Sequence, residues 1–253
     1  MGVHNYQFTS TIDDSKDVLS FNQKVTIRVG DLELAGEYQG TETYELYGTS
    51  VKKYNGTDQY GRAVEFNIDD ATGKLSRLNY LLFTETDHLH TQEECQEIAE
   101  DFLYAVVGER TDYVLYNTVA KEIPEYGGAV YDFLFAKAFG DMLSDEDIRI
   151  QVSAYGVVEY YYAEFLYEDS STAELTYDEQ AADEAIANQI AAIYGELESS
   201  NFTFTSYEIK TKRLSKFHDG NNYIRYEIRV RLDSKSDDNF ESHETLYLAV
   251  RIP

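Results

Sequence analysis

The segment from Thr91 to Gly108, TQEECQEIAEDFLYAVVG, constrains the fold of this chain more than any other stretch. Thr91, followed three residues later by Glu94, forms a capping box, which marks the start of a helix. Apolar residues then recur at helical spacing, at Cys95, Ile98, Ala99, Phe102, Leu103 and Val106. Gly108 suits the left-handed position that commonly ends a helix. The segment therefore predicts an amphipathic helix whose apolar face packs against another element.

A second segment, TYDEQAADEAIANQIAAIYG at 176–195, repeats this design. Thr176 and Glu179 predict another capping box, and the apolar stripe consists of Ala182, Ile186, Ile190 and Ile193. Strand-like sequence follows each segment, and the interval between the two is too long for a solenoid of small repeats. The pattern fits two successive modules, each a helix lying across a sheet.

The sequence outside these segments alternates apolar and polar residues, as half-buried antiparallel strands do. In GRAVEFNID, for example, Val64, Phe66 and Ile68 alternate with Ala63, Glu65 and Asn67. Turn signals separate such runs, at Gly30-Asp31, Asn55-Gly56, 69–73 and Tyr155-Gly156. Residues 24–83 therefore predict a series of antiparallel strands.

We predict an α+β fold of tandem modules, in which each module is one helix packed on a twisted antiparallel sheet. The expected divisions are a lead-in at 1–23, a strand module at 24–90, a helix-plus-sheet module at 91–170 and a second one at 171–253. The strand module could be a degenerate repeat of the other two. The polar stretch EDSSTAEL at 168–175 is the best linker candidate.

The formal net charge of -26 argues against nucleic acid or an anionic membrane surface as a direct partner. A solvated acidic surface that keeps the protein soluble is the simplest interpretation, and a binding face for basic partners or cations is the alternative. One basic run contains Lys210, Lys212, Arg213 and Lys216. It predicts a solvated sheet face, or contact with acidic groups of a partner or a neighbouring module.

Cys95 is the single cysteine, so the chain cannot form an intrachain disulfide. On the apolar stripe of the first helix it is expected to behave as a small buried hydrophobe. No stretch approaches the ~18 apolar residues of a membrane-spanning helix, and no signal-peptide pattern is present. Met1 could be a native start, or a start that replaced a removed leader.

Two clusters could bind metal. His88 and His90 precede the first helix, but Glu94 is used by the capping box and a site needs more than two ligands, so a solvated loop is expected. Carboxylates also gather between two strands, at Asp141, Asp145, Glu146 and Asp147. They lack the spacing and central glycine of an EF-hand loop, so a charged hairpin tip is expected rather than a calcium site. No catalytic motif occurs.

The run Glu159-Tyr160-Tyr161-Tyr162, with Phe165 after it, places aromatic residues on both faces of one strand. Half of them should pack under a helix. The others should either pack across strands or form an exposed aromatic surface of the kind enriched at interfaces. Tyr160, Tyr161, Tyr162 and Phe165 are therefore the candidate binding face.

Three segments resemble a known bacterial family. FNIDDATGKLSRLNY (66–80) resembles the strand–turn–strand of PepSY-type repeats, and 91–108 resembles the helix that opens each repeat. Residues 131–165 resemble the paired strands that follow the helix in each PepSY-type repeat. The matching positions are Phe135, Lys137, Gly140, Ile148, Val152, Gly156 and Val158. The arrangement is similar to YcdB/YcdC-like exported proteins with tandem PepSY-like modules. The resemblance implies a non-catalytic, extracytoplasmic protein, often a membrane-anchored lipoprotein, and some members are proposed to restrain peptidases.

The functional expectation is a non-enzymatic, extracytoplasmic binding or regulatory protein without cofactor, which recognises a protein or envelope partner through a sheet face. Membrane anchoring through a removed leader is expected, and a cytoplasmic location stays open. One alternative is a structural spacer. Another is a carboxylate-based enzyme acting on a glycan or small molecule, which a deep pocket with two facing carboxylates would favour.

Overall fold

The computed structural model describes residues 9–12, 24–44, 49–80, 89–108, 113–123, 128–139, 142–163, 177–195, 201–216, 221–236 and 241–252. These residues form thirteen strands and two helices. In the first part of the chain the strands are β1 (Thr9–Ile12), β2 (Lys24–Val29), β3 (Leu32–Tyr44), β4 (Thr49–Asp58), β5 (Ala63–Asp69) and β6 (Leu75–Tyr80), followed by α1 (Gln92–Val107). Then come β7 (Tyr113–Ile123), β8 (Gly128–Phe139), β9 (Met142–Ser153), β10 (Val158–Ala163), α2 (Glu179–Gly195), β11 (Phe202–Lys216), β12 (Asn222–Ser234) and β13 (Glu241–Ile252).

The strands are hydrogen-bonded in one mixed sheet rather than in separate modules. Its order is β1-β2-β3-β4-β5-β6-β10-β9-β11-β12-β13, with β8 on β9 and β7 on β8. One edge of β9 is shared, because its second half pairs antiparallel with β10 and its start, at Leu143 and Ser144, pairs parallel with β11. The predicted fold class, α+β tandem modules that each hold a helix on an antiparallel sheet, is therefore wrong: the described chain is mostly β.

The described residues divide into two compact units. The N-terminal unit lies within Met1–Lys137 and Glu146–Asp169, and the C-terminal unit lies within Ala138–Asp145 and Ser170–Pro253. The end of β8 and the start of β9 thus belong to the C-terminal unit. The module boundaries predicted from the sequence stay predictions.

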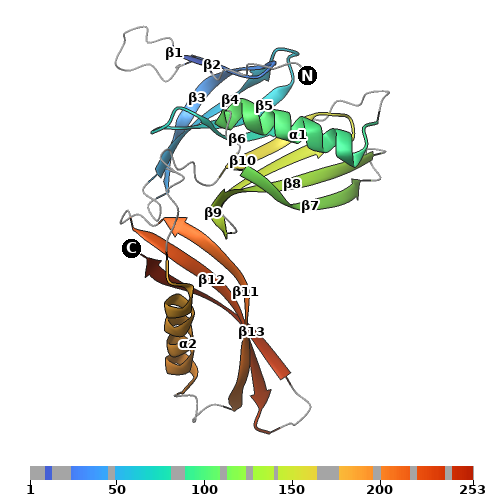
Figure 1. Ribbon diagram of the computed structural model, residues 1–253. Coiled ribbons are helices and arrows are strands. Elements are labelled where there is room, and N and C mark those ends of the chain that lie inside the picture. The colour runs from blue at the N-terminus through green and yellow to red at the C-terminus, as the bar shows by residue number, and fades with distance from the viewer. Residues whose placement is uncertain are drawn as a thin grey trace. The chain divides into compact units, whose positions relative to one another are not determined.

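Helix α1 begins at the predicted capping box and ends at the predicted glycine, although Gly108, with a ψ of -172°, is not in the left-handed helical conformation. The Thr91 hydroxyl accepts a hydrogen bond from the Glu94 N–H at 3.2 Å, and the Glu94 carboxylate accepts one from the Thr91 N–H at 2.8 Å. At the other end, Gly108 has a φ of 83°, which costs glycine little. The helix lies across one face of the part of the sheet that belongs to the N-terminal unit, called the N-terminal sheet below (Figure 1).

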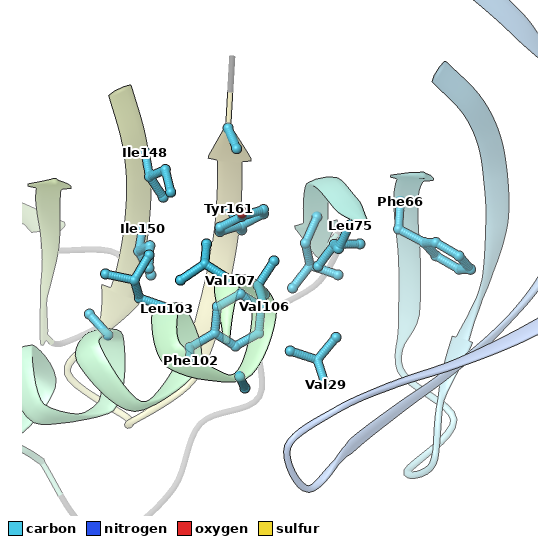
Figure 2. Close-up of a cluster of buried hydrophobic side chains, with 14 of the residues drawn as sticks. Val29, Phe66, Leu75, Phe102, Leu103, Val106, Val107, Ile148, Ile150 and Tyr161 are labelled. Carbon is cyan, nitrogen blue, oxygen red and sulfur yellow. The ribbon is translucent and has the colours of Figure 1, made fainter. Parts of the chain in front are cut away.

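The core of the N-terminal unit lies between α1 and that sheet face. Figure 2 shows Phe102, Leu103 and Val106 of α1 directed at buried side chains of several strands. The Phe102 ring meets the Tyr161 ring edge-on at 5.4 Å between centroids. Burying each large apolar side chain contributes about 1.5–3 kcal/mol, so this layer accounts for much of the stability of the unit.

The predicted hairpin at Asn55-Gly56 is wrong, whereas the turns predicted at Gly30-Asp31, 69–73 and Tyr155-Gly156 are confirmed. Asn55 and Gly56 lie inside β4, where Gly56 is paired with Gly36 of β3. A Cβ on Gly56 would lie 1.9 Å from the carbonyl oxygen of Ala35. The glycine is therefore needed for close approach of two strands, not for a turn.

In the C-terminal unit, α2 covers one face of β11, β12 and β13 (Figure 1). The helix begins at Glu179, where the Asp178 carboxylate accepts a hydrogen bond from the Ala181 N–H at 3.0 Å. Glu179 is thus the first helical residue and not the third, as the predicted capping box required; Thr176 and the linker candidate lie outside the described residues. Lys212 faces α2 and donates hydrogen bonds to Glu179 at 2.8 Å and Asp183 at 2.9 Å. This residue of the basic run contacts acidic groups of its own unit.

Candidate functional site

The face of the N-terminal sheet opposite α1 carries two rows of polar and aromatic side chains. Residues directly opposite each other on paired strands share a face. One row is Gln151, Tyr160, Asn79, Glu65 and Asn55, and the next is Arg149, Tyr162, Arg77, Asn67 and Lys53. The row between them, Ile150, Tyr161, Leu78, Phe66 and Tyr54, is buried on the α1 side. We call the two rows together the polar face.

An aromatic and cationic cluster occupies one end of the polar face. The rings of Tyr160 and Tyr162 stack, with 6.5 Å between centroids. The guanidinium groups of Arg149 and Arg77 lie 5.6 Å and 6.0 Å from the Tyr160 ring centroid, within cation–π range. Arg149 also forms a bidentate ion pair with Asp132 of β8. Its Nε and Nη2 atoms donate hydrogen bonds to the two carboxylate oxygens at 2.9 Å and 2.7 Å.

A groove of about 280 Å³ occupies the other end, between β3, β4, β5 and β6. It is lined by Gln39, Lys53, Tyr54, Asn55, Glu65, Asn67 and Arg77. Asn67 is 7% exposed, and its side-chain amide has no hydrogen bond to another described residue. Its polar atoms are not among the buried atoms that lack a partner, so they reach the groove and are accessible to water or to a bound molecule.

A β-bulge shapes the strand that carries the tyrosines. Val158 pairs with Val152 and Tyr160 pairs with Gln151, which leaves Glu159 as an extra residue on β10. Bulges re-aim neighbouring side chains and are frequent beside functional sites. Glu159 is buried, and this burial raises its pKa to about 7, although a hydrogen bond from Ser153 lowers it.

The buried Glu159 predicts a pH-dependent stability. Between its ordinary pKa of 4.5 and about 7, the folded protein holds a proton that the unfolded chain has released. The free energy of unfolding should therefore fall as the pH rises through this range and level off above it. Glu159→Gln should abolish that fall and, at pH 8, exceed wild type by about 3 kcal/mol. Urea unfolding at pH 5 and pH 8 measures both values. The exposed control Glu97→Gln should retain the wild-type fall, and a Glu159→Gln variant with the same fall would refute the assignment.

The predicted metal candidates do not come together in the described part of the chain. His88 and Asp141 lie outside the described residues. His90 Nδ1 is 3.7 Å from the Glu94 carboxylate, which caps α1. The His90 ring lies against Gly156. No group of three or more His, Cys, Asp or Glu side chains among the described residues is arranged to hold a metal ion.

The described acidic residues of this cluster, Asp145, Glu146 and Asp147, lie within β9 and do not form a charged hairpin tip. Asp145 is buried and accepts a hydrogen bond from the Ser215 hydroxyl at 2.5 Å, with Arg225 at 3.6 Å. Glu146 is fully buried and accepts a hydrogen bond from the Tyr113 hydroxyl. Asp147 is half-buried. These contacts fix the start of β9 and the β7–β9 layer.

The predicted binding-face residues are divided between the two faces of β10. Tyr160 and Tyr162 lie on the polar face, and Tyr161 is completely buried under α1. Phe165 lies outside the described residues. Sequence reasoning missed the groove, although the alternation of Glu65 and Asn67 with Val64, Phe66 and Ile68 already indicated a polar face on β5. Nothing in the sequence linked that strand to the tyrosines of β10.

A protein-family model, the YcdB, YcdC repeated domain, matches residues 38–165, just over half of the chain. The chain belongs to this family. The match confirms the resemblance seen in the sequence, and it includes all ten residues of the polar face. The described helices of this YcdB/YcdC-family chain include none that is long and apolar enough to span a membrane.

Other comparisons add little to the YcdB/YcdC assignment. The sequence matches none of the curated proteins with which it was compared. Among solved structures, the Bacillus megaterium YpeB C-terminal domain is similar, with a TM-score of 0.41 and 12% identity over 86% of this chain and 90% of that one. At that TM-score the likeness supports no argument about fold or function.

Proposed function

We propose that this YcdB/YcdC-family chain is a non-enzymatic binding or regulatory protein that works outside the cytoplasm. It recognises a protein or envelope partner through the polar face of its N-terminal sheet. One observation carries the proposal: the polar face joins a half-exposed pair of tyrosines to a groove with polar groups that lack partners within the described protein. Interfaces are enriched in Tyr and Arg, and such residues commonly dominate binding energy.

The groove favours binding over carboxylate-based hydrolysis. Glycosidases of the usual kind need two carboxyl groups on either side of the scissile bond. Glu65 is the single carboxylate among the described residues that line the groove.

Removing the two tyrosines tests the proposed function. Wild-type protein is mixed with bacterial envelope fragments, walls and membranes with their proteins, and the bound fraction is measured by sedimentation. Tyr160→Ser with Tyr162→Ser should weaken binding at least tenfold, because truncating central aromatic anchors commonly costs ~2 kcal/mol or more. Tyr247→Ser, at a 67% exposed tyrosine of β13, is the matched control and should bind as wild type. Wild type that stays in solution, or a double variant that binds normally, would contradict the proposal.

A further inference from the structure

The groove between β3 and β6 is suited to an acidic sugar, and this inference rests on the proposed function. Arg77 is the first reason. Five described arginines, Arg28, Arg62, Arg149, Arg225 and Arg231, each pair with a carboxylate. Arg77, Arg229 and Arg251 form no ion pair with a described carboxylate, and of these three Arg77 is the one that lines the groove. It lies at the rim of the groove with the Tyr160 ring beside it.

A guanidinium in this position is prepared for a carboxylate of a ligand. Its planar fork binds a carboxylate through two parallel hydrogen bonds. Contact with Tyr160 restricts its orientation before the ligand arrives. The second groove cation, Lys53, has a carboxylate partner, Glu42 at 3.2 Å, in an exposed ion pair. Arg77 has no such partner among the described residues, so the carboxylate of the ligand is directed at Arg77.

The rest of the groove presents groups that fit sugar hydroxyls. Asn55, Asn67 and Glu65 make no side-chain hydrogen bond to another described residue. Amides offer both donors and acceptors and the carboxylate offers acceptors, whereas each hydroxyl can do both. Neighbours across paired strands are ~4.5–5.5 Å apart, which is about the width of one sugar ring. The volume of about 280 Å³ lies just below the ~300–1,000 Å³ of drug-sized sites, so it suits one sugar residue.

The strand pairing disfavours an acidic peptide in the same place. Peptides that bind sheets usually add a strand to a free edge. Strand β5 is paired with β4 and β6, and β6 with β5 and β10, so neither strand offers a free edge to a peptide. The contacts with a ligand on this surface are therefore made mainly by side chains. We infer that this groove binds a carboxylate-bearing sugar residue of an acidic oligosaccharide, with its carboxylate on Arg77 and its hydroxyls on Asn67, Asn55 and Glu65.

Calorimetry on the full chain tests this inference with three probes: trigalacturonic acid, maltotriose as the neutral sugar, and triglutamate as the acidic peptide. Trigalacturonic acid should bind at least tenfold more tightly than either of the others. Arg77→Gln should remove at least tenfold of that affinity, because the charge-assisted hydrogen bonds are lost. Asn67→Asp should also weaken binding, since it replaces the amide with a second anion. Lys24→Gln, an exposed lysine outside the groove, should bind as wild type.

Three results would overturn the acidic-sugar assignment: no heat with trigalacturonic acid, equal affinity for maltotriose or triglutamate, or unchanged affinity in Arg77→Gln. Urea unfolding of each variant shows whether a loss of binding comes from a loss of fold. If envelope binding depends on Tyr160 and Tyr162 while no sugar binds, the sugar assignment fails and the proposed function stands. If envelope binding is absent but trigalacturonic acid binds, the reverse holds.

Discussion

Gly56→Ala is expected to destabilise the protein by more than ~4 kcal/mol, an exceptional loss for one methyl group. The added Cβ would lie 1.9 Å from the Ala35 carbonyl oxygen and 2.6 Å from the Gly36 Cα. Both are backbone atoms of β3, so no change of rotamer can relieve the contact. Strands β3 and β4 would have to separate at the Gly36–Gly56 pair. Urea unfolding followed by circular dichroism measures the loss.

Alanine substitutions at two other glycines should destabilise the protein less than Gly56→Ala. A Cβ on Gly36 would lie 2.7 Å from the Phe66 ring, a side chain that can shift, so Gly36→Ala should cost less than Gly56→Ala. A Cβ on Gly195, at the end of α2, meets nothing within 4 Å. Gly195→Ala should stay within ~0.5 kcal/mol of wild type. Equal stabilities for the Gly56 and Gly195 variants would show that β3 and β4 are not as close as described.

Asp58→Ala is expected to cost about 3 kcal/mol, as for one partner lost from a buried ion pair. Asp58 is 5% exposed and ends β4. Its carboxylate accepts hydrogen bonds from the N–H groups of Tyr60 and Arg62 at 2.9 Å, from Arg62 Nε at 2.6 Å and from the Tyr80 hydroxyl at 3.1 Å. Alanine would leave the Arg62 charge and the buried Tyr80 hydroxyl without this partner. Chemical unfolding at pH 7 measures the change.

An exposed ion pair of equal length is the control for Asp58. Arg28 and Glu33 are also 2.6 Å apart, but their side chains are 61% and 43% exposed. Glu33→Ala should therefore cost at most ~0.5 kcal/mol. Burial raises the pKa of Asp58, but the hydrogen bonds from Arg62 outweigh it and the pKa is lowered from 3.8. The contribution is thus present above pH 3.8 and is lost as the pH falls through the lowered pKa. Similar losses for Asp58→Ala and Glu33→Ala would contradict this account.

The elements with strong local signals could be predicted from the sequence. The capping box at Thr91 and Glu94 and the glycine at 108 act within a few residues, so they fix α1 wherever it packs. The alternation of β5 likewise predicts that Val64, Phe66 and Ile68 are buried, as they are. The hairpin predicted at Asn55-Gly56 is wrong because this dipeptide, which is common in hairpin turns, here allows the close approach of two strands. The start of α2 was misplaced because two residues that can cap a helix, Thr176 and Asp178, lie close together.

The candidate site could be predicted only in part. Tyr160 and Tyr162 were identified from the aromatic run, and their separation from Tyr161 follows from the two-residue period of a strand. Arg77, Asn67 and the groove were not identified. They join the tyrosines only through the pairing of β6 with β10, between residues far apart in the sequence. The choice of partner strand depends on the whole packed core, and no local pattern encodes it.

The sequence by itself determined the helices, most strand faces and the family, because these depend on short-range periodicity and on matched residues. Only the tertiary structure decided that the strands form one mixed sheet and that two rows of polar side chains lie side by side. Backbone hydrogen bonding is nearly the same for any pair of strands. Register and partner are therefore selected by side-chain packing across the sheet, and that packing exists only once the chain has folded.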